Sequence, residues 1–224
     1  MQGLDLDYMV GLLPVLLRYL PLTLELAAAG MVLALVLACL LAVVRFLKVP
    51  VLNGIVVVFI SFFRGTPLLV QLFLFYFGLP QVFSFLTVIN GITATILGLT
   101  LHFSAYMAES IRAAIVGVDR SQTEAARSIG MTTGQMMRRI VLPQAARVAA
   151  PTLMNYFIDM IKSTSLAFTL GVTELMGATQ KEAAGSFLYF EAFITVALIY
   201  WVVVEALSWL QQRMEFTLNR AYRR

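Results

Sequence analysis

Residues 124–143 decide the fold, and they read Glu-Ala-Ala-Arg-Ser-Ile-Gly-Met-Thr-Thr-Gly-Gln-Met-Met-Arg-Arg-Ile-Val-Leu-Pro. This stretch is too polar to lie in lipid, and Arg120 and Arg147 extend its positive charge on both sides. Apolar segments long enough to cross a bilayer flank it. The sequence therefore predicts a polar loop of roughly 35 residues between two membrane spans, and loops of that length are usually functional.

Local pattern divides this loop into two short helices. Ser121 followed by Glu124 fits a capping box for the first helix, and Gly130 suits a left-handed helix end. Thr132 or Thr133 can cap a second helix, which we expect from Gly134 to about Val141 and ending before Pro143. A solvated surface hairpin with ordinary caps accounts for the same pattern.

The composition indicates an integral membrane protein. Of the 224 residues, 60% are hydrophobic and 12% are charged, whereas soluble domains are about 45–50% apolar and about 25% charged. Cys39 and His102 are the only cysteine and histidine, which excludes an internal disulfide and a zinc or haem site built from them.

Hydropathy predicts five membrane spans, at 22–44, 66–86, 91–111, 151–175 and 187–209. They form a transmembrane domain at 22–212 with the polar loop at 113–150. Residues 1–21 are expected to be an extracytoplasmic segment with a short interfacial helix, and 213–224 a basic cytoplasmic tail. The run 51–63 is expected to be a short helix against the membrane or the bundle, because Arg64-Gly65-Thr66-Pro67 interrupts the apolar pattern.

Charge sets the orientation of these spans. Thirteen of the 16 Lys and Arg residues fall at one set of span ends, two fall at the other set, and Lys162 lies inside a span. Positive residues favour the cytoplasmic side. We therefore expect the N-terminus outside, with the polar loop and the C-terminus in the cytoplasm.

The sequence contains no motif of an enzyme. It has no Gly-x-x-x-x-Gly-Lys-Ser/Thr phosphate loop, no Ser-His-Asp set and no cluster with metal-ligand spacing. We therefore expect no catalytic activity, no cofactor or metal in this chain, and no nucleic acid partner.

Polar groups inside the expected third and fourth spans are the candidate substrate path, because such groups are costly in lipid and usually face a bundle interior or a water path. They are His102, Tyr106, Glu109, Arg112, Asn155, Asp159 and Lys162. Two interpretations remain open for the charged ones. Glu109 with Arg112 and Asp159 with Lys162 can be internal ion pairs, or the charges can line a cavity that suits a zwitterion.

The polar loop resembles the EAA loop of ABC importer permeases. The resemblance rests on Glu-Ala-Ala at 124–126, Gly130, and the run Leu142-Pro143-Gln144-Ala145. In that family the loop docks on a cytoplasmic ATPase. The resemblance therefore implies ATPase-coupling roles for Glu124, Ala125, Ala126, Gly130, Leu142 and Pro143.

Other segments are similar to the polar amino-acid permeases of the histidine, glutamine, arginine and cystine type. They are 63–68 with Gln71, 104–112, 162–166 and 174–175. The segments 144–148 and 200–220 are most similar to cystine permeases. This chain has Ser163 where the family often has Asp after the lysine of the fourth span, which leaves the substrate preference open.

The resemblance implies an all-helical type I importer permease fold with five transmembrane helices in the bacterial inner membrane. It implies an ATPase dimer that binds ATP and Mg, a second permease subunit that is identical or different, and an extracytoplasmic binding protein. The substrate would be a polar amino acid, with L-cystine as a candidate, moved by alternating access.

Two other functions remain alternatives. The first is a stand-alone secondary transporter or channel that uses Glu109, Asp159 and Lys162 as a relay, although the chain lacks an evident inverted repeat, which is common in such transporters. The second is an inactive assembly subunit.

Overall fold

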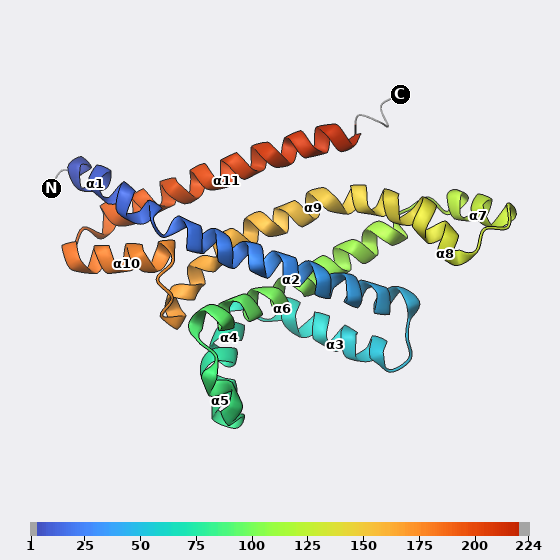
Figure 1. Cartoon of the computed structure of the whole chain (residues 1–224), viewed down its shortest axis with the longest axis horizontal. Helices are drawn as coiled ribbons and strands as arrows, with labels where there is room; N and C mark the ends of the chain where they lie inside the picture. The colour runs from blue at the N-terminus through green and yellow to red at the C-terminus, as the bar shows by residue number, and fades with distance from the viewer. Residues whose placement is uncertain (1–3, 220–224) are drawn as a thin grey trace.

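A computed structural model describes residues 4–219, which contain helices and no strand (Figure 1). The α-helices are α1 (Leu6–Leu17), α2 (Leu20–Leu47), α3 (Leu52–Gly65), α4 (Leu68–Phe73), α5 (Leu79–Val82), α6 (Gly91–Val116), α7 (Arg120–Ser128), α8 (Thr133–Met136), α9 (Leu142–Ser163), α10 (Leu175–Ser186) and α11 (Tyr189–Asn219). Two π-helical turns, η1 (Leu74–Gly78) and η3 (Met137–Val141), and two 3₁₀ helices, η2 (Ser84–Val88) and η4 (Thr164–Leu170), connect them.

The long helices α2, α6 and α9 form the centre of the bundle, and small residues let them approach closely. Ala27, Gly30, Ala34 and Ala38 of α2 are buried. A Cβ atom added at Gly30 would lie 2.9 Å from Met160 Sδ in α9 and 3.3 Å from Leu99 Cβ in α6. Small residues commonly allow this contact between membrane helices.

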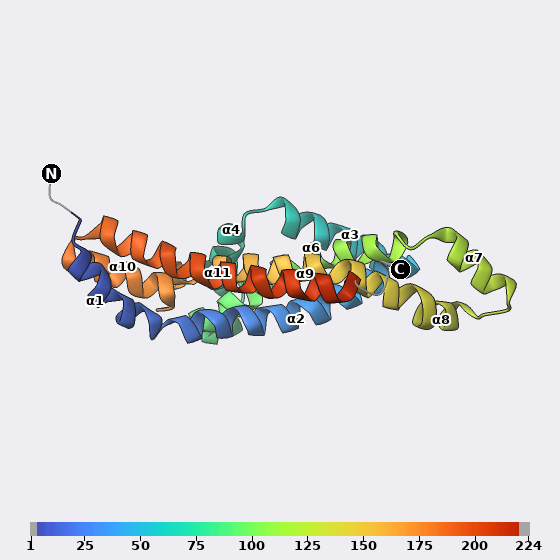
Figure 2. The same cartoon turned by 90° about the horizontal axis from the view of Figure 1, so that it is seen from above.

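The molecule is elongated, and its two ends carry different elements. Both views place α1 and α10 at one end of the long axis and α7 and α8 at the other (Figures 1 and 2). Helix α2 runs from the α1 end toward the α7 end, and α11 follows the same direction. The arginine-rich loop and the later part of α11 therefore lie toward the same end of the molecule.

Three described helices are long and apolar enough to cross a membrane: α2, α6 and residues 189–217 of α11. The pair Leu52–Gly65 and Leu68–Val82 passes the same test together but is bent by 111°. The bend lies at the interruption expected between the short helix 51–63 and the second span, and the span at 66–86 stays a prediction. Thr66 is extended (φ −120°, ψ 146°), as expected for a residue before proline, and the helix axis turns there.

Several helix limits differ from the expected spans. Helix α6 continues beyond residue 111 to Val116. Helix α11 continues through residue 213 to Asn219, so no structural boundary separates a tail at 213. Residues 220–224 of the expected tail lie outside the described part. In place of a single span at 151–175, α9 ends at Ser163 and a 3₁₀ helix leads to the left-handed Gly171. Where the chain enters and leaves the membrane stays a prediction.

The polar loop forms two helices, and the first begins earlier than expected. Asp119 is its N-cap, and its Oδ1 accepts a hydrogen bond from Ser121 N–H at 2.8 Å. The Ser121 and Glu124 capping box is therefore wrong. The predicted end is confirmed: Gly130 has φ +76°, and Met131 N–H donates to Ala126 O at 3.1 Å, as in a Schellman motif.

The second loop helix does not stop before Pro143. Thr132 caps it through a capping box with Gln135, which confirms one of the two expected caps. The helix then passes through the π turn Met137–Val141, where Leu142 N–H donates to Met137 O, and continues as α9. The wider π turn accommodates Pro143, which lacks an N–H group and would clash within a regular helix.

The contact at Gly30 gives a test of the packing. Gly30→Val should lower the free energy of unfolding by about 1–3 kcal/mol, because the added atoms meet Met160 and the backbone-proximal Cβ of Leu99. The measurement is thermal unfolding of the purified protein in detergent. Gly54→Val in α3 is the matched control, since nothing lies within 4 Å of a Cβ there. Equal stability of the two variants would contradict close packing at Gly30.

Candidate functional site

A cavity of about 540 Å³ lies where α6 faces α9 and η4. Its lining residues are His102, Phe103, Tyr106, Tyr156, Asp159, Lys162, Ser163, Ser165 and Leu166. Four of the expected path residues, His102, Tyr106, Asp159 and Lys162, thus meet in one space. Asn155 is exposed and is not among the lining residues.

Asp159 and Lys162 place opposite charges on the wall of this cavity. They lie one turn apart on α9, and Lys162 Nζ is 2.7 Å from Asp159 Oδ1. Each side chain is 53% exposed. Exposed ion pairs of this kind contribute only about 0–1 kcal/mol. A ligand with both charges can therefore replace this pairing at small cost.

Aromatic rings form the wall beside the ion pair. The Tyr106 ring lies 5.1 Å from the His102 ring and 6.2 Å from the Tyr156 ring, centroid to centroid. Tyr156 is fixed by a 2.9 Å hydrogen bond between its hydroxyl and Ser110 Oγ. Sequence reasoning missed Tyr156, which lies three residues before Asp159 and so on the same face of α9.

The break between α3 and α4 contacts the same wall. The Arg64 guanidinium carbon lies 5.3 Å from the Tyr106 ring centroid, and the Tyr106 hydroxyl donates to Arg64 O at 3.2 Å. Gln71 of α4 is 1% exposed. Its Oε1 lies 3.1 Å from His102 Nδ1. Arg64 and Gln71, on the two sides of the bend at residues 65–67, thus each contact a cavity residue.

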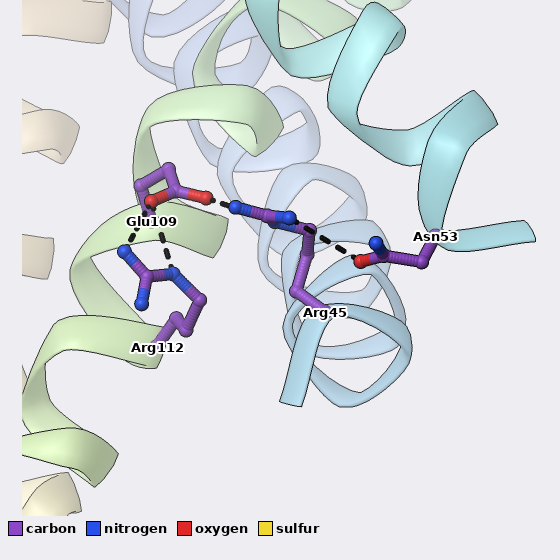
Figure 3. Close-up of polar contacts among 4 residues, drawn as sticks. All are labelled: Arg45, Asn53, Glu109 and Arg112. Carbon is purple, nitrogen blue, oxygen red and sulfur yellow. Dashed lines mark hydrogen bonds and ion pairs between the residues drawn. The ribbon is translucent and has the colours of Figure 1, made fainter. Parts of the chain in front are cut away.

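Glu109 and Arg112 belong to a separate ion-pair cluster (Figure 3). Glu109 Oε2 accepts from Arg112 Nε at 3.0 Å and Nη2 at 2.8 Å, while Glu109 Oε1 accepts from Arg45 Nε at 3.4 Å. Arg45 Nη1 also donates to Asn53 Oδ1 at 3.2 Å. The cluster joins α6 to α2 and α3 and does not line the cavity. The internal-pair interpretation therefore describes Glu109 and Arg112.

Sequence reasoning missed Arg45 as the third charged member of this cluster. Arg45 lies 64 residues from Glu109 along the chain. Nothing in its local pattern indicates which distant carboxylate it contacts.

The expected coupling residues divide into an inner and an outer group. Ala126 is 2% exposed and packs with Ala114, Met136 and Val141, so it holds α7 against the bundle. The other five, Glu124, Ala125, Gly130, Leu142 and Pro143, are exposed. A hollow of about 540 Å³ between α7 and the start of α9 is lined by several residues, including Ala125, Ile129 and Pro143.

At the start of α7, Asp119 is held as a carboxylate. The hydrogen bonds from the Ser121 N–H and hydroxyl groups lower the pKa of the Asp119 carboxyl. The cap is therefore complete at neutral pH and is lost only as the pH falls through this lowered value.

A bundle of membrane-length apolar helices, with a charged cavity between two helices and a capped helical loop at one end, defines a membrane transport subunit. The family described as "Binding-protein-dependent transport system inner membrane component" matches residues 30–220. The chain belongs to this family.

Curated relatives and solved structures agree with that assignment. The chain is 62% identical over 221 residues to the "Probable amino-acid ABC transporter permease protein PatM" of Vibrio harveyi, covering 99% of each. It is 45% identical over 223 residues to the "Probable amino-acid permease protein YxeN" of Bacillus subtilis, covering 100% of each. An amino acid ABC transporter crystallised with histidines matches with a TM-score of 0.89 and 34% identity, over 96% of this chain and 99% of that one.

A methionine ABC transporter, MetNI, shares the fold at 19% identity, with a TM-score of 0.74 over 91% of this chain and 95% of that one. The expected fold class, an all-helical type I ABC importer permease, is confirmed. The chain is an amino-acid ABC importer permease subunit and not an enzyme, and the ATPase is a separate subunit. This excludes the stand-alone secondary transporter.

The cluster around Glu109 gives a second test. In a double-mutant cycle, Arg45→Met and Glu109→Gln should be coupled by about 0.5–3 kcal/mol in unfolding free energy, because residues that share an ion pair are not additive. Thermal unfolding in detergent supplies the four values. Lys48→Met with Glu109→Gln is the control cycle, since Lys48 is exposed at the end of the same helix. Equal coupling in both cycles would refute a specific Arg45–Glu109 interaction.

Proposed function

We propose that this permease moves a zwitterionic polar amino acid through the cavity between α6 and α9, and that a separate ATPase drives it through the loop at 113–150. The observation that carries the proposal is the pair of half-exposed opposite charges, Asp159 and Lys162, on one cavity wall. A zwitterion presents a carboxylate and an ammonium group a few ångströms apart, which is the complement of this pair.

Binding would exchange one ion pair for two. The substrate carboxylate would take hydrogen bonds from Lys162 Nζ, and the substrate ammonium would donate to Asp159. The exchange is favourable because the Asp159–Lys162 pair itself is weakened by solvent. Tyr106 and Tyr156 would cover the apolar part of the substrate.

L-cystine is the first candidate substrate. The "L-cystine transport system permease protein TcyL" of Bacillus subtilis is 36% identical over 212 residues, covering 93% of this chain and 89% of that protein. Relatives named for arginine and glutamine transport are 32% and 33% identical. All three substrates are polar amino acids with a zwitterionic backbone, so uptake assays with these three define the preference.

The helix that begins in the loop offers a direct mechanical connection to the cavity. The chain is helical from Thr133 through the π turn and along α9 to Ser163. Because Asp159 and Lys162 lie near the far end of this helix, a displacement of the loop tilts the charged pair with it. Closure of an ATPase dimer on the loop would thus open the cavity outward, and separation of the dimer would open it inward.

The remaining partners follow from this mechanism. A second permease subunit, identical or different, would complete the path, and an extracytoplasmic binding protein would deliver the amino acid at the end that carries α1 and α10. The N-terminus would lie outside, and the loop and the C-terminus in the cytoplasm, because the arginines of the loop favour that side. ATP and Mg would be bound by the ATPase.

The charged pair can be tested by removing one charge at a time. Asp159→Asn and Lys162→Met should each reduce uptake of the preferred amino acid about tenfold to a hundredfold, since a lost charge-assisted hydrogen bond costs about 1.5–3 kcal/mol. Uptake is measured in ATP-loaded proteoliposomes of the whole complex. Glu205→Gln and Lys181→Met, both exposed elsewhere, are the matched controls. Normal uptake by both cavity variants would remove the pair from the substrate path.

The coupling surface can be tested by co-purification of the ATPase. Ala125→Arg should release the ATPase, because Ala125 is exposed beside the hollow at α7 and a long side chain would fill it. Gly130→Val should do the same by straining the left-handed turn at φ +76°. Ala184→Arg on α10, exposed at the opposite end of the molecule, is the control. Retention of a stoichiometric, active ATPase by both loop variants would disprove this docking surface.

A further inference from the structure

Gln71 is a buried polar side chain whose orientation is fixed by its neighbours. Its Nε2 lies 3.1 Å from Phe63 O, 3.1 Å from Thr66 O and 2.8 Å from Thr66 Oγ1. The Thr66 hydroxyl donates to Phe62 O at 2.8 Å, so a lone pair of its oxygen is available to Gln71. The reversed amide would place its oxygen against two carbonyl oxygens, and the NH₂ group therefore faces the break between α3 and α4.

This orientation decides which ring nitrogen of His102 carries the proton. With Nε2 of Gln71 turned toward the break, its Oε1 faces His102 Nδ1 at 3.1 Å. An amide oxygen only accepts hydrogen bonds, so Nδ1 of His102 must be the N–H donor. In the neutral imidazole the other nitrogen, Nε2, then carries no hydrogen and is a hydrogen-bond acceptor.

The acceptor nitrogen belongs to a residue of the cavity wall. His102 is half-buried and lines the cavity. One of its ring nitrogens is bonded to Gln71. The groups around the ring are Tyr106 on its own helix, Gln71 from α4, Arg64 behind Tyr106, and Asp159, Lys162 and Tyr156 from α9.

We propose that His102, held in this tautomer by Gln71, is a specificity-determining residue that accepts a hydrogen bond from a second donor group of the substrate. This inference rests on the proposed function, in which Asp159 takes the α-ammonium group and Lys162 the α-carboxylate. His102 then accepts a hydrogen bond from the side chain of the substrate. It favours amino acids with a side-chain N–H, such as an ammonium, amide or guanidinium group. Gln71 is a positioning residue, because it acts only through His102.

Two substitutions of His102 separate recognition from structure. Asparagine can place an N–H where Nδ1 lies, and so keeps the bond to Gln71 but loses the acceptor at the Nε2 position. Glutamine can place an oxygen near the Nε2 position, and so keeps the acceptor but loses the bond to Gln71. If His102 reads the substrate, H102Q should keep the wild-type KM within a few-fold and H102N should raise it about tenfold or more.

Uptake is measured in ATP-loaded proteoliposomes of the whole complex with labelled L-cystine, or with labelled arginine or glutamine if the wild type prefers one of them. The opposite order, with H102N active and H102Q impaired, would assign His102 a purely structural role and overturn the inference. If the wild type moves none of the three amino acids, the proposed substrate class fails instead. The two failures are therefore distinguishable.

The tautomer itself can be observed without any transport. His102 is the only histidine of the chain, so the full-length permease with ¹⁵N-labelled histidine and a tag free of histidine gives signals from one ring. The wild type in lipid nanodiscs should show a protonated Nδ1 and a bare Nε2. Methionine has no side-chain carbonyl, so Gln71→Met removes the acceptor that faces His102 Nδ1. This variant should shift the ring toward the Nε2–H form. A wild-type ring that carries its proton on Nε2 would overturn the inference.

Discussion

The continuity of helical hydrogen bonds past Pro143 is the constraint on which the rest of the structure depends. A proline at that position would ordinarily end a helix, and the loop would then be a separate hairpin hung on the membrane domain. The π turn at Met137–Val141 removes the conflict, because its wider ring of atoms leaves room for the proline. The loop and the wall of the cavity are consequently parts of one helix, and the proposed coupling uses this connection.

The charged groups inside the bundle divide into two kinds, and their surroundings explain the difference. Glu109 has a side chain that is 19% exposed and accepts hydrogen bonds from two arginines. Removing one partner would leave charge behind in a partly buried site, so this cluster stabilises the junction of α2, α3 and α6. Asp159 and Lys162 are exposed to the cavity and hold each other weakly. The first set is suited to fixing helices, and the second set is suited to changing partners.

The sequence predicted those features that depend on neighbouring residues or on composition. The left-handed Gly130, the Thr132 cap and the membrane class all follow from local chemistry. It missed features that depend on distant partners or on backbone geometry: Arg45 beside Glu109, Gln71 beside His102, and the helix through Pro143. The Asp119 cap was missed for a different reason. Asp119 and Ser121 are both good caps, and in the fold the helix that begins after Asp119 buries Ala126 against Ala114, Met136 and Val141.

The bend between α3 and α4 connects these observations. In lipid, a backbone break must find hydrogen-bond partners within the protein. Here the amide of Gln71 supplies them for Phe63 and Thr66, and the same amide orients His102. The group that makes the break tolerable thus also sets the chemistry of the cavity wall. A change in the bend would turn Gln71 and alter what His102 offers to the substrate, so the shape of this broken segment and the selectivity of the cavity are expected to change together.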